Sequence, residues 1–317
     1  MVLIRDLFLQ GAQMLLVLAV APLLVGFTRK VKAWLLRRNG PPLIQPYRDL
    51  RRLLRKEIVV AENASWLFRS APYLILAATW VAAALVPTFA TGLQFSWTAD
   101  LIVITALLGS VRFFLALAGM DVGTSFGGIG ASREMMFASL AEPAMIMIVF
   151  TVALVAGTTQ LSEVADFVFA HASLRVSLAL ALVALVIVAL AENTRIPVDN
   201  PATHLELTMV HEAMLLEYSG RHLAVIELAA SLKLLLYISL IVCMFTPWGL
   251  AQSGSGPTAY AIGVGSYLGK LAVGGFLLVL FETSIAKMRV FRVPEFLGAA
   301  LMLGLLGTLL LFVSRTF

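Results

Sequence analysis

The chain has 317 residues, of which 60% are hydrophobic and only 13% are charged. A mean hydropathy of +0.95 excludes a soluble domain, because the surface of such a domain would be apolar almost everywhere. We interpret the net charge of +5 as the sidedness of a membrane protein, and we expect no nucleic-acid binding.

Eight apolar runs are long enough to cross a bilayer, which takes about 20 residues. They begin near Phe8, Ala71, Leu101, Ala138, Leu174, Leu223, Gly263 and Phe296. The sequence therefore predicts an all-α, polytopic membrane protein in which residues 1–317 form a single integral membrane domain. The first run has no clear cleavage site and is followed by Arg29, Lys30 and Lys32, so we expect it to remain as a mature helix.

Basic residues are concentrated between the first two runs, where residues 29–70 hold eleven of the 23 Lys and Arg. The segments without any Lys or Arg are 91–100, 159–173 and 247–262. By the positive-inside rule, the basic segment is cytoplasmic. With eight spans, both termini then face the outer (periplasmic) side. The other predicted cytoplasmic loops are 121–133, 192–222 and 284–295.

The first cytoplasmic loop contains "RKVKAWLLRRNGPPLIQPYRDLRRLLRKE" at residues 29–57. A short helix is predicted after Pro46, with leucines on one face and arginines around the rest. It either lies on anionic lipid or docks a soluble partner. The acids Asp49 and Glu57 slightly favour docking, because a lipid anchor would not need them. The docking candidates are Gln45, Arg48, Asp49, Arg52, Lys56, Glu57 and, from the second loop, Tyr218.

The second cytoplasmic loop begins with "AENTRIPVDNPATHLEL" at residues 191–207. Pro197 and Pro201 prevent one helix from running straight through it. His204 and His211 are seven residues apart, which is about two helical turns. No third ligand has a suitable spacing, and "VHEAM" lacks the second histidine of HExxH. We therefore predict no metal site in this chain.

Ionisable side chains inside membrane spans are costly and usually functional. With the predicted orientation, nearly all of them fall in the cytoplasmic half. Carboxylates with cationic neighbours have pKa values that burial can shift, as a proton or ion half-channel requires. The alternative is that Arg112, Glu142 and Lys233 pair only to hold the bundle together. The candidate path residues are Arg112, Asp121, Glu134, Glu142, Glu192, Arg195, Asp199, His204, Glu206, Glu212, Glu217, Lys233 and Glu282.

Two motifs carry a resemblance to a known family. One is the frame "AExxRxPxDxP...EL...EYSG" from Ala191 to Gly220, and the other is "GPPLIQPYRDLRRLLRKE" after the first helix. The chain resembles the H-type membrane subunit (subunit one) of respiratory complex I and its relatives in energy-converting NiFe hydrogenases. "MDVGTSFGGIGASREMM", "QPYRDL" and "FETSIAKMRVFRVPEFLG" are similar to the hydrogenase branch, which serves formate hydrogenlyase and hydrogenase-4.

This resemblance implies a non-catalytic subunit in the cytoplasmic (inner) membrane of a bacterium or archaeon. It implies an anchor for a peripheral arm made of a NiFe large subunit, a small Fe–S subunit and a ferredoxin-like subunit. The NiFe centre and the Fe–S clusters would belong to those partners, with no cofactor in this chain. The resemblance also implies coupling of the arm's redox chemistry to proton or sodium movement through antiporter-like membrane subunits.

The chain departs from the family pattern after Pro201. Where the family carries a run of glutamates, Ala202 and His204 replace two of them. Since histidine titrates near neutral pH, we expect His204 to relay protons in place of a glutamate. Replacing His204 by alanine would then uncouple ion movement and leave hydrogenase activity intact.

Two other functions stay open from the sequence. The chain is alternatively the quinone-binding subunit of an NADH:quinone oxidoreductase, which an apolar cavity beneath residues 29–57 would favour; a filled or closed cavity would favour the hydrogenase. It is alternatively an independent secondary transporter. The lack of an evident internal repeat argues against the transporter, because many transporters are built from repeated halves.

Overall fold

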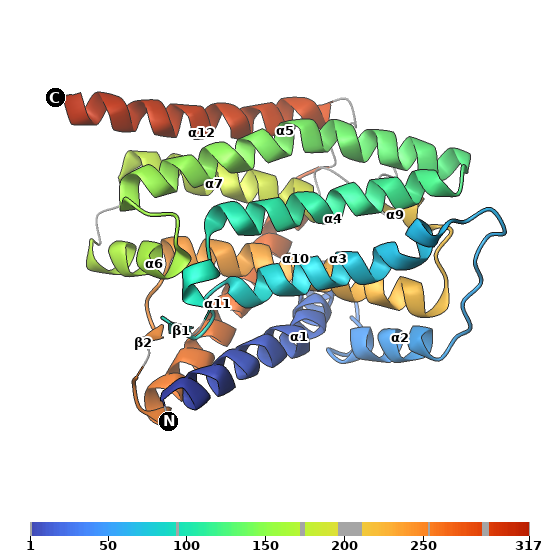
Figure 1. Cartoon of the computed structure of the whole chain (residues 1–317), viewed down its shortest axis with the longest axis horizontal. Coiled ribbons are helices and arrows are strands. Elements are labelled where there is room, and N and C mark those ends of the chain that lie inside the picture. The colour runs from blue at the N-terminus through green and yellow to red at the C-terminus, as the bar shows by residue number, and fades with distance from the viewer. Residues whose placement is uncertain are drawn as a thin grey trace.

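The computed structural model describes residues 2–92, 95–171, 175–195, 211–252, 254–286 and 292–316. Within these ranges the chain forms a bundle of long helices (Figure 1). The long helices are α1 (Val2–Leu35), α3 (Trp66–Leu85), α4 (Leu101–Asp121), α5 (Ser125–Ala156), α7 (Val176–Glu192), α10 (Gly220–Phe245), α11 (Pro257–Ser284) and α12 (Val293–Thr316). Seven have the length and hydropathy of membrane spans, and α7 is a shorter apolar helix. The all-α polytopic fold is thus confirmed.

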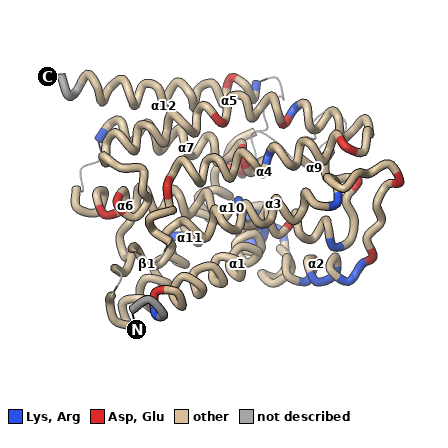
Figure 2. The backbone as a smooth tube through the Cα atoms, viewed as in Figure 1, with Lys and Arg blue, Asp and Glu red and all other residues tan. Residues whose placement is uncertain are grey.

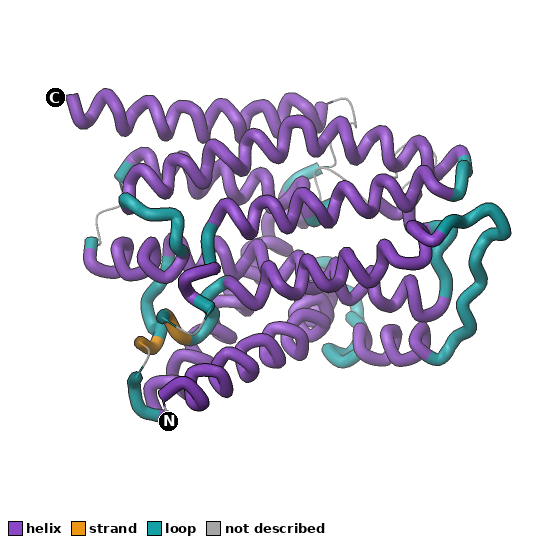
Figure 3. The backbone as a smooth tube through the Cα atoms, in the orientation of Figure 1, coloured by secondary structure: helices purple, strands orange, loops and turns teal. Residues whose placement is uncertain are grey.

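Short elements connect the long helices, as the backbone coloured by secondary structure shows (Figure 3). The short helix predicted after Pro46 is confirmed, although it begins slightly earlier: α2 (Gln45–Leu54) carries Pro46 in its first turn, where proline is well tolerated. Neither α6 (Leu161–Ala170) nor the pairing of two tiny strands was predicted from the sequence. The remaining short elements are α9 (His211–Leu215), the 3₁₀-helix η1 (Ser96–Thr98), and β1 (Ala90–Thr91), which pairs in parallel with β2 (Ala251–Gln252).

The two ends of the bundle differ in their contents. Both termini, α6 and the two strands lie at one end, and α2 and α9 lie near the other (Figure 1). Lys and Arg are dense around α2 and the segment that follows it (Figure 2). This arrangement places the basic segment and the termini at opposite ends, as predicted. Which end faces the cytoplasm stays a prediction.

The predicted cytoplasmic loop 121–133 is wrong in its extent. Only residues 122–124 separate α4 from α5, and Gly123 makes the turn with a φ of +71°. Thr124 then caps α5, because its hydroxyl accepts a hydrogen bond from the backbone N–H of Gly127. The helix continues for 32 residues, or about 48 Å. Residues 125–133, predicted as loop, therefore belong to α5.

The long helices pack around one large apolar core. In it, α5 lies against α4, α7 and α12, while α3 lies against α4 and α10. α1 packs on α10 and α11, and α2 bridges α1 and α10. Large apolar side chains are also exposed on α11 and α12, for example Leu277 and Phe312, as expected where helices face lipid. The charged residues described next are therefore surrounded by apolar packing.

Candidate functional site

Four charged side chains are buried together between α4, α5, α7 and α10. Arg112 of α4 pairs with Glu134 of α5, with 3.0 Å between Nε and Oε1. The same guanidinium pairs with Glu192 at the end of α7, with 2.9 Å between Nη1 and Oε1. Lys233 of α10 lies 2.8 Å from the second oxygen of Glu192. We call these residues, Arg112, Glu134, Glu192 and Lys233, the central cluster.

The central cluster is costly to bury, since each charge loses its hydration, and direct pairing offsets only part of that cost. Its side chains are between 4% and 13% exposed. Two cations balance two anions, so the cluster as a whole is neutral when all four are charged. A proton added to Glu134 or Glu192 would break this balance, and neighbouring charges therefore control when one binds. Such an arrangement suits charge-coupled proton uptake and release.

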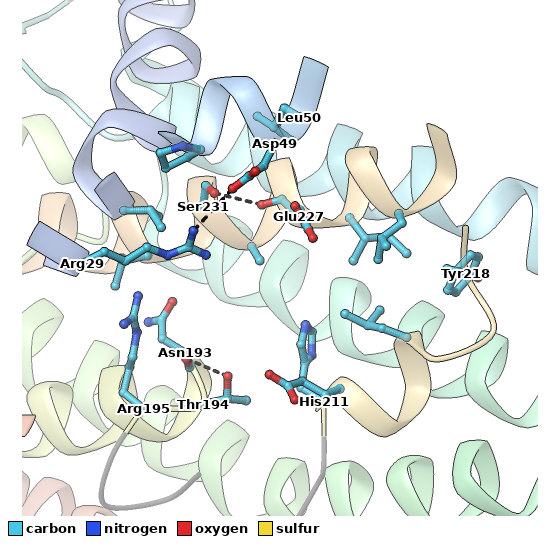
Figure 4. Close-up of a pocket in the computed structure, with 18 of the residues that line it drawn as sticks. Arg29, Asp49, Leu50, Asn193, Thr194, Arg195, His211, Tyr218, Glu227 and Ser231 are labelled. Atoms are coloured by element: carbon cyan, nitrogen blue, oxygen red, sulfur yellow. Dashed lines mark hydrogen bonds and ion pairs between the residues drawn. The ribbon is translucent and has the colours of Figure 1, made fainter. Parts of the chain in front are cut away.

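A cavity of about 760 Å³ lies between α1, α2, α9, α10 and the end of α7 (Figure 4). In Figure 4, Arg29 and Asp49 occupy one side of it, and Arg195 and His211 lie on the opposite side. Apolar side chains such as Leu50 complete the wall. The titratable residues in the wall are Arg29, Lys32, Asp49, Arg195, His211, Glu212, Tyr218, Glu227 and Glu282. The wall is therefore strongly charged for a cavity inside an apolar bundle.

A smaller cavity of about 70 Å³ lies between this large cavity and the central cluster. All four cluster residues line it. Five residues line both cavities: Asn193, Thr194, His211, Ile226 and Ala230. His211 therefore lies in the wall between the large cavity and the cavity that the cluster lines.

His211 begins α9 at this junction. Burial lowers the pKa of His211 to about 4, and the positive charges of Lys233 and Arg112 act in the same direction, while Glu134 opposes them. The imidazole is then neutral near pH 7, with one nitrogen that donates and one that accepts. A neutral imidazole between a cavity and buried carboxylates can pass a proton without holding a charge.

A second group of charges lies at the edge of the large cavity. Glu282 at the end of α11 is 1% exposed and pairs with Lys32 of α1 at 3.0 Å and with Arg195 at 3.4 Å. Arg195 follows Glu192 of the central cluster by three residues, and Thr194 between them has a φ of +49°. This turn therefore supplies a member to each of the two charged groups.

Two predicted path residues lie apart from both groups. Asp121, at the end of α4, accepts a hydrogen bond from the backbone N–H of Ser65 at 2.8 Å. Glu142 is exposed on α5 and lines a groove of about 1150 Å³ with Gly109 and Phe113 of α4. A carboxylate on the outer face of a membrane span is costly without a polar neighbour. Glu142 therefore marks this groove as a candidate contact for another polar group.

The remaining path candidates lie near the second cytoplasmic loop. Glu212 lines the large cavity, and Glu217 lies partly buried in the turn after α9. Asp199, His204 and Glu206 fall outside the described residues. In the part of the chain that the structure describes, no group of three or more His, Cys, Asp or Glu side chains is placed to hold a metal ion.

The docking candidates divide between the cavity and the surface. Asp49 faces the cavity, where it accepts a hydrogen bond from Gln45 at 3.1 Å and lies 3.6 Å from Arg52 and 3.9 Å from Arg29. Tyr218 is buried. The candidates exposed at the surface are Arg48, Arg52, Lys56 and Glu57.

A sequence model of the family described as NADH dehydrogenase matches residues 9–313. The chain belongs to this family. Formate hydrogenlyase subunit 4 of Escherichia coli is 35% identical over 285 residues, which are 89% of this chain and 91% of that protein. Hydrogenase-4 component C of the same organism is 34% identical over 241 residues, 76% of each chain. NADH-ubiquinone oxidoreductase chain 1 of Triticum aestivum is 29% identical over 242 residues, which are 71% of this chain and 72% of that protein.

A solved structure shares the fold of this NADH dehydrogenase family member. A chain of the membrane-bound sulfane sulfur reductase, an archaeal respiratory membrane complex, superposes with a TM-score of 0.78 at 20% identity, covering 98% of this chain and 99% of that one. The predicted resemblance to the complex I membrane subunit and to the hydrogenase membrane subunits is thus confirmed. So is the prediction of a multi-pass membrane protein.

Several cavity residues of this family member were not predicted from the sequence. Lys32 was assigned only to the positive flank of the first helix, although it reaches Glu282. Glu227 lies six residues before Lys233 in the same apolar run, so it could have been selected for the same reason as Lys233. From its spacing to His204, His211 is expected only to be a solvated or hydrogen-bonded histidine and not a metal ligand. Its place between the two cavities depends on packing that no spacing in the sequence reveals.

Proposed function

We propose that the chain is the membrane anchor and ion-coupling subunit of a hydrogenase-type redox complex related to complex I. One observation carries this proposal: a charged cavity beneath α2 adjoins the buried central cluster at His211. The relationship to formate hydrogenlyase subunit 4 over most of both chains supports it. The expected partners are a NiFe large subunit, a small Fe–S subunit and a ferredoxin-like subunit, together with antiporter-like membrane subunits.

In this proposal the redox centres belong to the partner subunits. This chain responds to the changes in charge that electron transfer produces there. Electron transfer in the docked arm alters the charge or conformation of the two cytoplasmic loops. The turn from Glu192 to Arg195 carries that change, because its two ends pair in different charged groups. Glu192 and Glu134 respond by taking up or releasing a proton, with Arg112 and Lys233 as counter-charges. Glu142 then faces the antiporter-like subunits from the groove between α4 and α5.

Co-purification tests the proposal directly. Membranes are solubilised gently, the complex is purified through an affinity tag on this chain, and the eluate is assayed for nickel, iron and hydrogen evolution. We expect all three in the eluate. A chain that emerges alone and moves a substrate in vesicles would overturn the proposal in favour of an independent transporter.

Substitution of Glu192 tests the coupling role in the same preparation. We expect Glu192→Gln to abolish ion movement driven by hydrogen evolution and to leave the rate of hydrogen evolution measurable. Glu163→Gln is the matched control, because Glu163 is an exposed glutamate on α6 at the other end of the bundle. Equal ion movement in the two variants would contradict the coupling role.

The quinone-binding subunit remains a second candidate because the large cavity is open. Its volume of about 760 Å³ falls in the usual range for small-molecule sites. The charged wall argues against it, because a quinone headgroup and tail bind in a mainly apolar pocket with few polar groups. Iron and flavin without nickel in the eluate, with NADH-dependent quinone reduction, would establish this second function in place of the first.

A further inference from the structure

The "EYSG" motif, residues 217–220, has no part in the central cluster, and its contacts point to another role. Ser219 is the N-cap residue of α10, where a serine hydroxyl usually accepts a hydrogen bond from its own helix. Here the hydroxyl makes no such bond. It accepts a hydrogen bond from the backbone N–H of Val59 and donates one to the carbonyl oxygen of Val59, both at 2.8 Å. One side chain thus satisfies both backbone groups of Val59.

The neighbours of Ser219 hold the same segment. Gly220 has a φ of +52°, and a Cβ at this position would overlap the carbonyl oxygen of Glu57. Only glycine combines this conformation with so close an approach. Tyr218 stacks on Phe68 with 4.0 Å between ring centroids and donates a hydrogen bond to the carbonyl oxygen of Phe68 at 3.0 Å. The motif is therefore a clamp that holds the chain between α2 and α3 at Glu57 and Val59 and holds the first turn of α3 at Phe68.

The far side of this connection is fixed as well. The side-chain amide of Asn63 donates to the carbonyl oxygen of Val122 at 2.6 Å, and Asp121 accepts from the backbone N–H of Ser65. Residues 56–62 contain no helix or strand, and we call them the clamped loop. Its tip is apolar: Val59 is 72% exposed and Ile58 is 37% exposed. The fold thus holds an exposed valine in one position.

The surroundings of the clamped loop are basic. The exposed cations on it and on the adjoining helices are Arg48, Arg51, Arg52, Arg55, Lys56, Arg69 and Arg221. The exposed acids on the same elements are Glu57, Glu62 and, where α10 borders the large cavity, Glu227. The exposed apolar side chains nearby in sequence are Leu54 and Trp66. A small apolar tip within a positive field is complementary to an apolar pocket with an acidic rim.

We propose that the clamped loop is a docking knob and that Val59 inserts into an apolar pocket, rimmed by carboxylates, on a soluble subunit of the complex. This inference rests on the proposed function and names the surface that meets the partner. A rigid loop loses little conformational entropy on binding. The backbone of Val59 is already hydrogen-bonded, so covering it leaves no unsatisfied polar group. A fluid lipid headgroup layer would need neither property.

The salt concentration that releases the soluble metalloproteins from the tagged, purified complex tests the docking knob. Val59→Asp should weaken retention about tenfold, since it removes an apolar anchor and adds a charge that the acidic rim repels. Val176→Asp is the matched control: Val176 is also exposed, at the opposite end of the bundle. Ser219→Ala should weaken retention because it frees Val59, and Ser219→Thr should restore it because the hydroxyl is kept.

The outcomes separate this inference from the function on which it rests. Retention by Val59→Asp and Ser219→Ala equal to that of the unaltered chain would overturn the docking knob alone. Loss of binding to vesicles containing phosphatidylglycerol, with full retention of the metalloproteins, would also overturn it and would assign the loop to lipid. If the unaltered chain retains no soluble metalloprotein at all, the proposed function itself fails.

Discussion

Arg112 links three helices of the central cluster, because one guanidinium pairs with carboxylates from two other helices. We expect Arg112→Gln to lower the free energy of unfolding by about 3–5 kcal/mol, since it leaves Glu134 buried without its cation and Glu192 with Lys233 alone. Thermal unfolding of the solubilised complex measures this loss. Removing one carboxylate as well should recover part of it, so the double variant Arg112→Gln, Glu134→Gln should cost less than the sum of the two single changes. Additive costs would contradict the pairing.

His211 gives the site a dependence on pH. Its pKa in the fold is about 4, below the 6.5 of the unfolded chain. Between these values the unfolded chain binds more protons, so the free energy of unfolding should fall as the pH decreases from about 6.5 towards 4. His211→Gln removes this term, and the variant should lose less stability over that range. Unfolding midpoints at a series of pH values test this, with the exposed His171→Gln as the control. Identical profiles for His211→Gln and the unaltered chain would refute it.

The sequence revealed the members of the central cluster but not their pairing. Arg112, Glu192 and Lys233 were selected because charges in apolar runs are costly. Their depth follows from the rise per residue, yet the direction in which each side chain points depends on how the helices pack. Arg112 and Lys233 were accordingly grouped with Glu142, whereas the carboxylate between them is Glu192.

At the scale of elements, the packing of α2 against α1 positions one wall of the large cavity. Leu43 lies directly against Gly26 of α1, and a Cβ at Gly26 would overlap the carbonyl oxygen of Leu43. Tyr47 of α2 donates a hydrogen bond to the carbonyl oxygen of Ala19, close to Pro22, whose ring disturbs the hydrogen bonding of the preceding turn. These two contacts hold α2 and its approach segment on the first helix.

Substitution of Gly26 should therefore detach α2. We expect Gly26→Ala to speed tryptic cleavage between α1 and α3, because the segment at Leu43 must move away. Gly11→Ala in the same helix is the matched control: no neighbour lies within 4 Å of a Cβ there, so the change should be neutral or stabilise the helix by about 0.5–1 kcal/mol. Equal cleavage rates in the two variants would show that the close contact does not anchor α2.

Hydropathy predicted the long helices well because a membrane span must be both apolar and helical. It did not predict α6 or the pairing of β1 with β2, since two-residue strands carry no periodic pattern. It also misplaced the start of α5. The polar and glycine-rich residues 125–133 predict a loop, although they form the first turns of α5 and lead to Glu134, which is buried against Arg112. Pairing inside the bundle thus allowed charged residues within a helix.

At the scale of the whole molecule, the orientation in the membrane depends on whether α7 crosses it. α7 has 17 residues, about 25 Å of helix, which is shorter than the hydrocarbon core of about 30 Å. Local thinning of the bilayer accommodates such a helix at modest cost. With α7 the chain crosses eight times and both termini share one side, which agrees with their position at the same end of the bundle (Figure 1). Without it they would lie on opposite sides.

A reporter fused to the C-terminus distinguishes these two topologies. The basic segment 29–70 fixes the cytoplasmic side, so eight crossings place the C-terminus outside. Alkaline phosphatase requires disulfides that form outside the cytoplasm; we therefore expect a C-terminal fusion to be active and a fusion inserted after Arg38 to be inactive. An inactive C-terminal fusion would mean seven crossings. Glu192 would then end a helix that only enters the membrane.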